Sequence, residues 1–192
     1  MDETSMASMI ERIEDRQIQR EIERYHDEIE SYRWWGSEEG RCRIIANVRS
    51  LNRLGVTKID LLACRLERAR LENARLDGSN FYMTNLRRAN LNKASLREAC
   101  VMRSNLQEAS LIDADLRGAD LTKVNLRKAL VTSVNFRGAE LYEVDLREAK
   151  WLTIEQLSET KTLYLTKLDP DLMAEIEAKY PDLLVNPDFK KE

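Results

Sequence analysis

Histidine and cysteine are scarce in this sequence, which holds one histidine and three cysteines in 192 residues. A single histidine, His26, argues against a serine-type catalytic triad and against a metal site built from several histidines. The cysteines are odd in number and none belongs to a C-x-x-C motif, so neither a disulfide framework nor a zinc site is expected. They are Cys42, Cys64 and Cys100. Unpaired cysteines are typical of a reducing cytoplasm, which is the compartment we expect.

Long apolar runs and glycine-rich phosphate loops are also missing. No stretch approaches the roughly 20 consecutive apolar residues that a membrane-spanning helix needs. All three prolines lie after residue 152, and residues 61–151 carry 16 basic and 12 acidic side chains, a net charge of +4. With no candidate for catalysis, for a cofactor or for a metal, we expect a protein that is not an enzyme.

A repeat of five residues fills the middle of the chain. A leucine, or a phenylalanine, valine or tryptophan in its place, occupies every fifth position from Leu61 to Trp151, and a small residue stands two positions before almost every one. A period of five fits neither an α-helix nor a flat strand. It fits a chain that turns by about 90° per repeat, so that each leucine points inward and coils of four repeats stack through parallel hydrogen bonds.

This pattern resembles the pentapeptide-repeat family, whose motif is A-(D/N)-L-x-x. Good local matches are Ala89-Asn90-Leu91, Ala114-Asp115-Leu116 and Ala119-Asp120-Leu121. The resemblance implies an all-β solenoid core, a right-handed quadrilateral parallel β-helix of about 4.5 coils over residues 61–151. Gly78, Gly118 and Gly138 fall at its corner positions.

Helical flanks are expected at both ends, because an open β-helix end exposes unpaired backbone groups. The pattern of residues 37–60 predicts an N-terminal cap helix, with an apolar face that ends before Gly55, and the entry into the repeats. Residues 152–192 predict a C-terminal helical cap and tail. One short helix should begin after Thr153, and another should run from Asp169-Pro170 to about Tyr180.

Residues 1–36 predict a separate amphipathic helix, over about residues 6–35. Its apolar seam has the 4-3-4-3 spacing of a short coiled coil, although Ile10 and Ile13 are out of phase with it. The helix could lie on the solenoid or its cap, could bind a second copy or a partner helix, or could lie on a membrane surface. The seam residues, our candidates for oligomerisation, are Ile18, Ile22, Tyr25, Ile29 and Tyr32.

Stacking residues twenty apart predicts two basic faces. These are either solvated faces with mixed ion pairs or sites for an anionic surface such as nucleic acid or acidic lipid. The candidate anion-binding residues are Arg87, Arg88, Arg127, Lys128 and Arg147 on one face and Arg97, Arg117 and Arg137 on the opposite face. Aromatic residues are absent from these columns, which disfavours single-stranded nucleic acid.

A third face predicts an exposed apolar and aromatic stripe, a plausible contact for another protein unless the N-terminal helix covers it. The stripe residues are Leu62, Tyr82, Met83, Met102 and Tyr142. On the neighbouring column Cys100 is expected to point outward, whereas Cys64 should be packed inside.

These features predict a non-catalytic protein–protein interaction scaffold or regulator that presents flat solenoid faces, with the N-terminal helix used for self-association or partner docking. Binding of an anionic surface through the arginine faces is the alternative. The best-described members of the family mimic duplex DNA and act on type II topoisomerase. That activity requires a strongly acidic rod, and the net charge of +4 over residues 61–151 disfavours it here.

Overall fold

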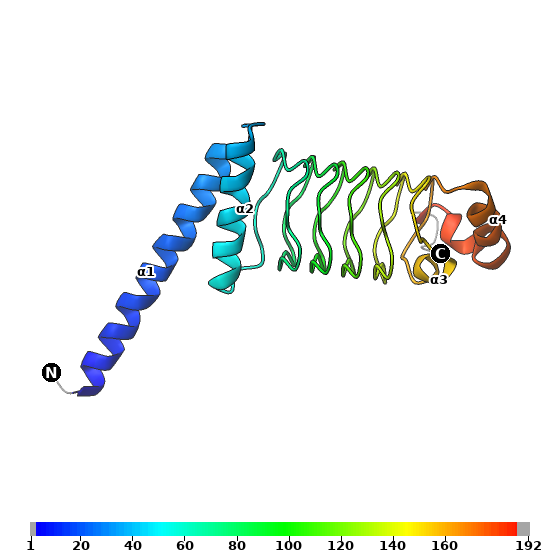
Figure 1. Ribbon diagram of the computed structural model, residues 1–192. Coiled ribbons are helices and arrows are strands. Elements are labelled where there is room, and N and C mark those ends of the chain that lie inside the picture. Colours follow the sequence, from blue (N-terminus) through cyan, green and yellow to red (C-terminus); the bar gives the residue numbers. More distant parts are fainter. Residues whose placement is uncertain (1–2, 188–192) are drawn as a thin grey trace.

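A stack of coils closed by helices at both ends makes up the protein (Figure 1). The computed structural model describes residues 3–187, with side chains from residue 12 onward. The chain begins with α1 (Glu3–Tyr32) and α2 (Glu38–Arg53), then winds through the stack. It ends with α3 (Ile154–Ser158), α4 (Pro170–Lys179) and the 3-10 helix η1 (Pro181–Leu184).

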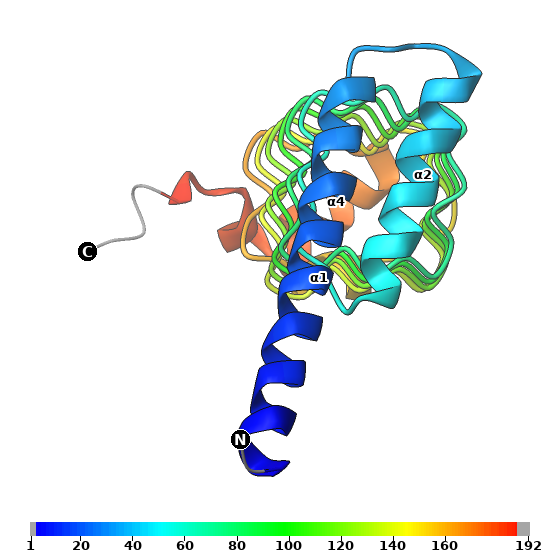
Figure 2. The same ribbon diagram turned by 90° about the vertical axis from the view of Figure 1, so that its left-hand side faces the viewer.

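The coils pair in parallel with a register of twenty residues. Asp60 bridges to Asn80, Asn80 to Cys100, and the same relation recurs at every fifth position, which gives each coil four sides. Viewed along the stack, the coils superpose in a common outline (Figure 2). The bridges are isolated single-residue contacts, because each side of five residues includes a turn that leaves no room for an extended strand.

Each corner is a tight turn centred after the inward leucine. In the first repeat the amide of Cys64 donates to the carbonyl of Leu61 at 3.1 Å, and Ala63 between them has a φ of 53°. A positive φ at the third residue is the mark of a type II turn. The three glycines expected at corners do occupy this position, with φ from 66° to 68°.

The asparagine or aspartate of the motif stabilises the corner that follows it. The Oδ1 atom of Asn90 accepts a hydrogen bond from the amide of Asn92 at 3.0 Å, and Asn105 accepts one from Gln107 at 3.0 Å. Such a side chain mimics a backbone turn, which explains why the motif prefers Asn or Asp before the leucine.

The interior is filled as the five-residue period predicts up to Leu146, whereas Trp151, the last position of the predicted series, is 74% exposed. The leucines and their substitutes from Leu61 to Leu146 are buried, as are the small residues two positions before them. Polar small residues are also accommodated inside, since Thr84 donates from its hydroxyl to the carbonyl of Leu61 at 2.6 Å. Burial of this continuous column of apolar side chains stabilises coils that could not fold singly.

Helix α2 closes the N-terminal opening of the stack. Ile44, Val48 and Leu51 of α2 are fully buried against the first coil. The side chain of Asn52 bonds to backbone groups that a preceding coil would otherwise pair. It accepts from the amide of Arg75 at 2.8 Å and donates to the carbonyl of the same residue at 2.7 Å. Ser37 caps the start of α2 by accepting a hydrogen bond from Gly40, as its sequence predicts.

The C-terminal end differs from the expected boundary at residue 151. Parallel bridges continue to Thr162 and Lys167, with a register of 22 instead of twenty, because α3 is inserted between Lys150 and the resumed coil. Gln156 of α3 donates to the carbonyls of Val131 and Val134, both at 2.9 Å. The sequence of this segment departs from the repeat, so its period could not reveal the resumed coil.

Candidate interaction surfaces

The apolar stripe forms one column along the stack, as the register of twenty predicts. Its backbone hydrogen bonds link successive coils, for example from the amide of Met83 to the carbonyl of Met102 at 3.0 Å. The column also extends one coil further than predicted, to Tyr164, whose ring centroid lies 5.7 Å from that of Tyr142.

The stripe is less exposed than its sequence suggests. Leu62, Tyr82, Met102 and Tyr142 are half-buried, and Met83 alone among the stripe residues is exposed, at 56%. Neighbouring coils lie only about 4.8 Å apart, so each side chain is shielded by the ones above and below it. Cys100 is half-buried for the same reason.

Helix α1 does not run along the stripe. It packs on α2 at the N-terminal end of the molecule, and its first half projects past the side of the stack (Figures 1 and 2). Helix α1 therefore leaves the stripe uncovered, and the predicted competition between the helix and the stripe does not arise.

Most of the predicted oligomerisation seam has a partner within the chain. Ile29 is 1% exposed, and Ile22, Tyr25 and Tyr32 pack partly buried against the core. Ile18 lies on the projecting half and is 41% exposed. The heptad spacing thus reports a contact between α1 and α2, since an intramolecular helix pair uses the same spacing as a coiled coil between chains.

Two exposed tryptophans follow α1, and the sequence interpretation missed them. Trp34 is 70% exposed and borders an open hollow of about 610 Å³ that is also lined by Leu62 and Met83. Trp35 is exposed as well and meets Tyr32 edge to face, with ring centroids 5.3 Å apart. Two adjacent tryptophans just before Gly36 and Ser37 were the signal in the sequence.

The turn that carries the tryptophans is anchored on both sides. Arg33 is buried and donates to Asp60 of the first coil at 2.9 Å. The amide of Trp35 donates to the carbonyl of Tyr32 at 3.0 Å. Beyond the turn, a Cβ atom at Gly40 would lie 3.0 Å from the Cβ and the carbonyl oxygen of Trp35, so this close approach favours glycine.

The cations of the arginine faces are mostly ion-paired, but each carboxylate that two cations share offsets the charge of only one of them. Glu108 pairs with both Arg87 and Arg88, at 3.0 and 2.7 Å, and Asp115 pairs with both Arg97 and Arg117, at 3.0 and 2.7 Å.

The same pairing recurs toward the C-terminal end of the stack. Glu148 pairs with Arg127 and with Lys128, and Asp145 with Arg147 at 2.6 Å. Among the residues that the structure describes, Arg137 is the one candidate without an ion pair. A carboxylate from one coil falls between cations of the same or the next coil, which the period alone could not specify.

These pairs also set the pKa values of the acids. Hydrogen bonds from Arg88 and Arg87 hold the pKa of Glu108 below its usual range, and the hydrogen bond from Arg147 does the same for Asp145. Burial raises the pKa of the Cys64 thiol to about 12, so this cysteine is a packed, unreactive side chain. Within residues 3–187 no group of His, Cys, Asp and Glu side chains has the arrangement of a metal site.

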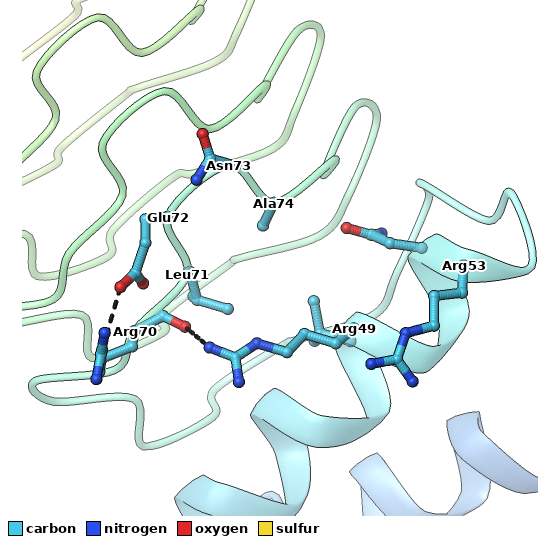
Figure 3. A pocket seen from close by; sticks show the side chains of 9 residues that line it. Arg49, Arg53, Arg70, Leu71, Glu72, Asn73 and Ala74 are labelled. Atoms are coloured by element: carbon cyan, nitrogen blue, oxygen red, sulfur yellow. Dashed lines mark hydrogen bonds and ion pairs between the residues drawn. The ribbon is translucent and has the colours of Figure 1, made fainter.

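A groove between α2 and the first coil was not predicted. One part of it, of about 300 Å³, is lined by Arg49 and Arg53 of α2 and by Arg70 and Glu72 of the coil (Figure 3). Arg49 donates to the carbonyl of Arg70 at 3.3 Å, and Arg70 pairs with Glu72 at 3.1 Å. The repeat period does not predict which residues of α2 face the coil, so the groove could not be derived from it.

Comparison with known proteins agrees with the repeat. A family model described as pentapeptide repeats matches in eight copies, over residues 64–107, 102–138 and 114–150. No curated protein matches the sequence. Within the described residues, no helix is both long and apolar enough to cross a bilayer.

Several solved structures are similar to the chain. A pentapeptide repeat protein from Nostoc PCC 7120 is 29% identical, with a TM-score of 0.47 over 65% of this chain and 94% of its own. One from the thylakoid lumen of Arabidopsis thaliana is 26% identical, with a TM-score of 0.40 over 52% and 71%. HetL of Nostoc, a regulator of heterocyst differentiation, is 24% identical, with a TM-score of 0.39 over 58% and 51%.

Proposed function

Because this chain belongs to the pentapeptide-repeat family through residues 64–150, we propose that it is a non-catalytic scaffold that binds another protein. The observation that supports the proposal most directly is the exposed pair Trp34 and Met83 around the hollow at the N-terminal end of the stripe. Tryptophan beside a concave apolar surface is typical of the centre of a protein–protein interface.

The proposed partner inserts an apolar side chain into the hollow. Leu62, Met83 and Trp34 would surround that side chain, while Arg65 and Glu67 at the rim supply polar contacts. Since Arg33 and Gly40 hold the tryptophan turn in place, little conformational entropy is lost when the partner binds. The half-buried stripe beyond the hollow extends the contact along the solenoid.

The test is affinity capture from lysate of the source cell with the full-length protein and the double variant Trp34→Ser with Met83→Ser. A partner that uses the hollow should be retained by the natural sequence and lost from the double variant. With the purified partner, the variant should raise Kd by about tenfold or more.

Trp151→Ser is the matched control, because Trp151 is 74% exposed at the other end of the stack. This control should retain the partner. An identical set of captured proteins for the two variants and the natural sequence would refute the role of the hollow.

The projecting half of α1 supports a second role, self-association with another copy of the chain. Ile13 and Ile18 of α1 are both more than 40% exposed. Light scattering coupled to gel filtration should show a mass that rises with concentration, and the double variant Ile13→Ser with Ile18→Ser should stay monomeric. A monomeric natural protein at all concentrations would contradict self-association.

The other two roles expected from the sequence are not proposed. Carboxylates pair with most cations of the arginine faces and so offset part of the charge that would attract an anionic surface. The net charge of +4 over residues 61–151 does not suit a mimic of duplex DNA.

A further inference from the structure

The groove beside α2 is lined by more arginines than acidic residues. Its two adjoining parts, of about 300 and 450 Å³, share Arg49 and Arg70. Two acidic residues, Glu38 and Glu72, belong to the same lining. The arginines of the groove are Arg41, Arg49, Arg53, Arg68 and Arg70.

The groove arginines differ from those of the repeat faces in their partners. Arg41 and Arg49 donate to the backbone carbonyls of Gly36 and Arg70, both at 3.3 Å. These acceptors are neutral, so they do not offset the positive charge of the two guanidinium groups. In the part of the chain that the structure describes, neither Arg53 nor Arg68 has an ion pair. Figure 3 shows Arg49 reaching from α2 toward the coil, with Arg53 one turn further along the helix. Unneutralised charge in a concave surface produces a strong positive potential.

A second observation indicates what kind of anion fits. The Oε1 atom of Glu72 accepts from Arg70, but its Oε2 atom is buried and has no hydrogen-bond partner among the described residues. A buried carboxylate oxygen without a donor is costly, so a ligand that supplies an N–H or O–H group would be favoured. A peptide backbone carries such donors, whereas the ionised phosphates of a nucleic acid carry none.

The shape of the groove favours a linear ligand. It follows α2, which has 16 residues and is about 24 Å long, a distance that about seven residues of extended peptide cover. Aromatic side chains, on which the bases of a single strand would stack, are absent from the lining among the described residues.

From these observations we propose that the groove binds an acidic peptide segment in an extended conformation. Carboxylates of the peptide pair with Arg49, Arg53 and Arg70. A rotation of the partly exposed Glu72 side chain brings its buried Oε2 atom to the groove, where a backbone N–H of the peptide donates to it. This site is separate from the tryptophan hollow and does not depend on the function proposed for that surface.

The test is fluorescence anisotropy with the full-length protein and a labelled peptide of alternating glutamate and serine, about eight residues long. In the double variant Arg49→Ala with Arg53→Ala we expect Kd to rise by about tenfold or more. The single variant Arg53→Ala should also weaken binding, and its folding is not at risk because Arg53 makes no hydrogen bond or ion pair among the described residues.

The matched control is the double variant Arg127→Ala with Arg147→Ala, which removes the same charge from a repeat face where both arginines are ion-paired. It should change Kd by less than about twofold. Equal weakening in both double variants would show a net-charge effect and overturn the site, as would failure of the natural protein to bind the peptide.

The variant Glu72→Gln distinguishes the proposed hydrogen bond from non-specific electrostatic attraction. It removes a negative charge, so simple electrostatics predicts tighter binding of the acidic peptide. The proposed hydrogen bond predicts weaker binding, because an amide N–H replaces the accepting oxygen. Tighter binding by this variant would overturn the proposal. An oligothymidylate of equal charge that binds more tightly than the peptide, and is lost in the groove variant, would assign the groove to nucleic acid instead.

Discussion

The two ends of the coil stack meet the same physical problem in different ways. Each end exposes backbone groups that the next coil would have paired. At the C-terminal end the coil resumes beyond α3, Gln156 donates to two carbonyls, and the amide of Leu163 donates to the carbonyl of Leu183 at 2.7 Å. At the N-terminal end the side chains of Asn52 and Arg49 bond to the backbone of the first coil, and Arg33 bonds to Asp60.

The difference shows when an end becomes a binding surface. Resumed coil and inserted helix cover the C-terminal edge directly. At the N-terminal edge, α2 packs on the first coil through its apolar face, and this leaves the arginine groove on one side and the tryptophan hollow on another. We therefore expect binding at the N-terminal end and mainly stability at the C-terminal end.

The largest expected effect is loss of a buried leucine from either closing helix. Leu51 of α2 and Leu157 of α3 are both fully buried. Leu51→Ala and Leu157→Ala should each lower the free energy of unfolding by about 2–5 kcal/mol, because a cavity remains. Urea denaturation measures both. A loss below about 1 kcal/mol for Leu51→Ala would show that α2 contributes little packing energy to the stack. It would contradict the expectation that both ends are closed by buried leucines.

The amide side chains at the two ends should differ in their contribution. Gln156→Ala removes the donor to the carbonyl of Val134 and one of the two donors to the carbonyl of Val131, and should cost about 1–3 kcal/mol. Asn52→Ala should cost less, about 0.5–1.5 kcal/mol, since water can reach the exposed Arg75 backbone. Gln156→Glu, which keeps the acceptor but removes the donors, is the control and should behave like Gln156→Ala. Equal costs at Asn52 and Gln156 would contradict the comparison.

Protonation of Asp145 in acid should lower the stability of the protein near the C-terminal end of the stack. The hydrogen bond from Arg147 lowers the pKa of Asp145 in the folded state. Its stabilising contribution is therefore complete above the unfolded pKa, about 3.9, and is lost as pH falls through the lower folded value. Asp145→Asn should lower Tm near neutral pH, and this difference from the natural protein should vanish in strong acid.

Asparagine at this position keeps the turn intact, since Asn125 one coil earlier accepts from the amide of Arg127 at 3.0 Å. Thermal unfolding followed across the acid range measures the effect. A difference in Tm that does not depend on pH would mean that the ion pair contributes nothing through its charge.

The smallest effect is expected for an ion pair on the outside of the coils. Lys123 and Glu143 form a largely exposed pair at 3.4 Å between two successive coils. Lys123→Ala or Glu143→Ala should change the free energy of unfolding by about 0–1 kcal/mol. Combined with Leu51→Ala, the effect should be additive. A larger, non-additive change would show that the ends communicate through the stack.

The period of five residues predicted most of the fold. The inward positions, the corner glycines and the register of twenty all follow from the need to bury a leucine at each repeat. The outward side chains are less predictable. Whether Glu108 meets Arg87 depends on the geometry of a corner, and the burial of Tyr82 depends on how closely coils stack.

The interaction surfaces escaped prediction where they join segments that the repeat does not relate. Trp34 lies beside Met83 because Arg33 anchors the turn to Asp60, a contact between residues 27 apart in the sequence. The groove likewise needs α2 and the first coil together. The seam of α1 was recognised, but its spacing is the same for a helix of this chain as for a helix of another.

Because the register is regular, the number of repeats sets the distance and the rotation between the two ends of the stack. Insertion of one whole coil of twenty residues would move the C-terminal helices about 4.8 Å along the axis without turning them. Insertion of a single repeat would instead swing them by about a quarter turn relative to the tryptophan hollow. A change in repeat number therefore alters the angle between surfaces at the two ends in discrete steps, while every contact within the coils stays the same.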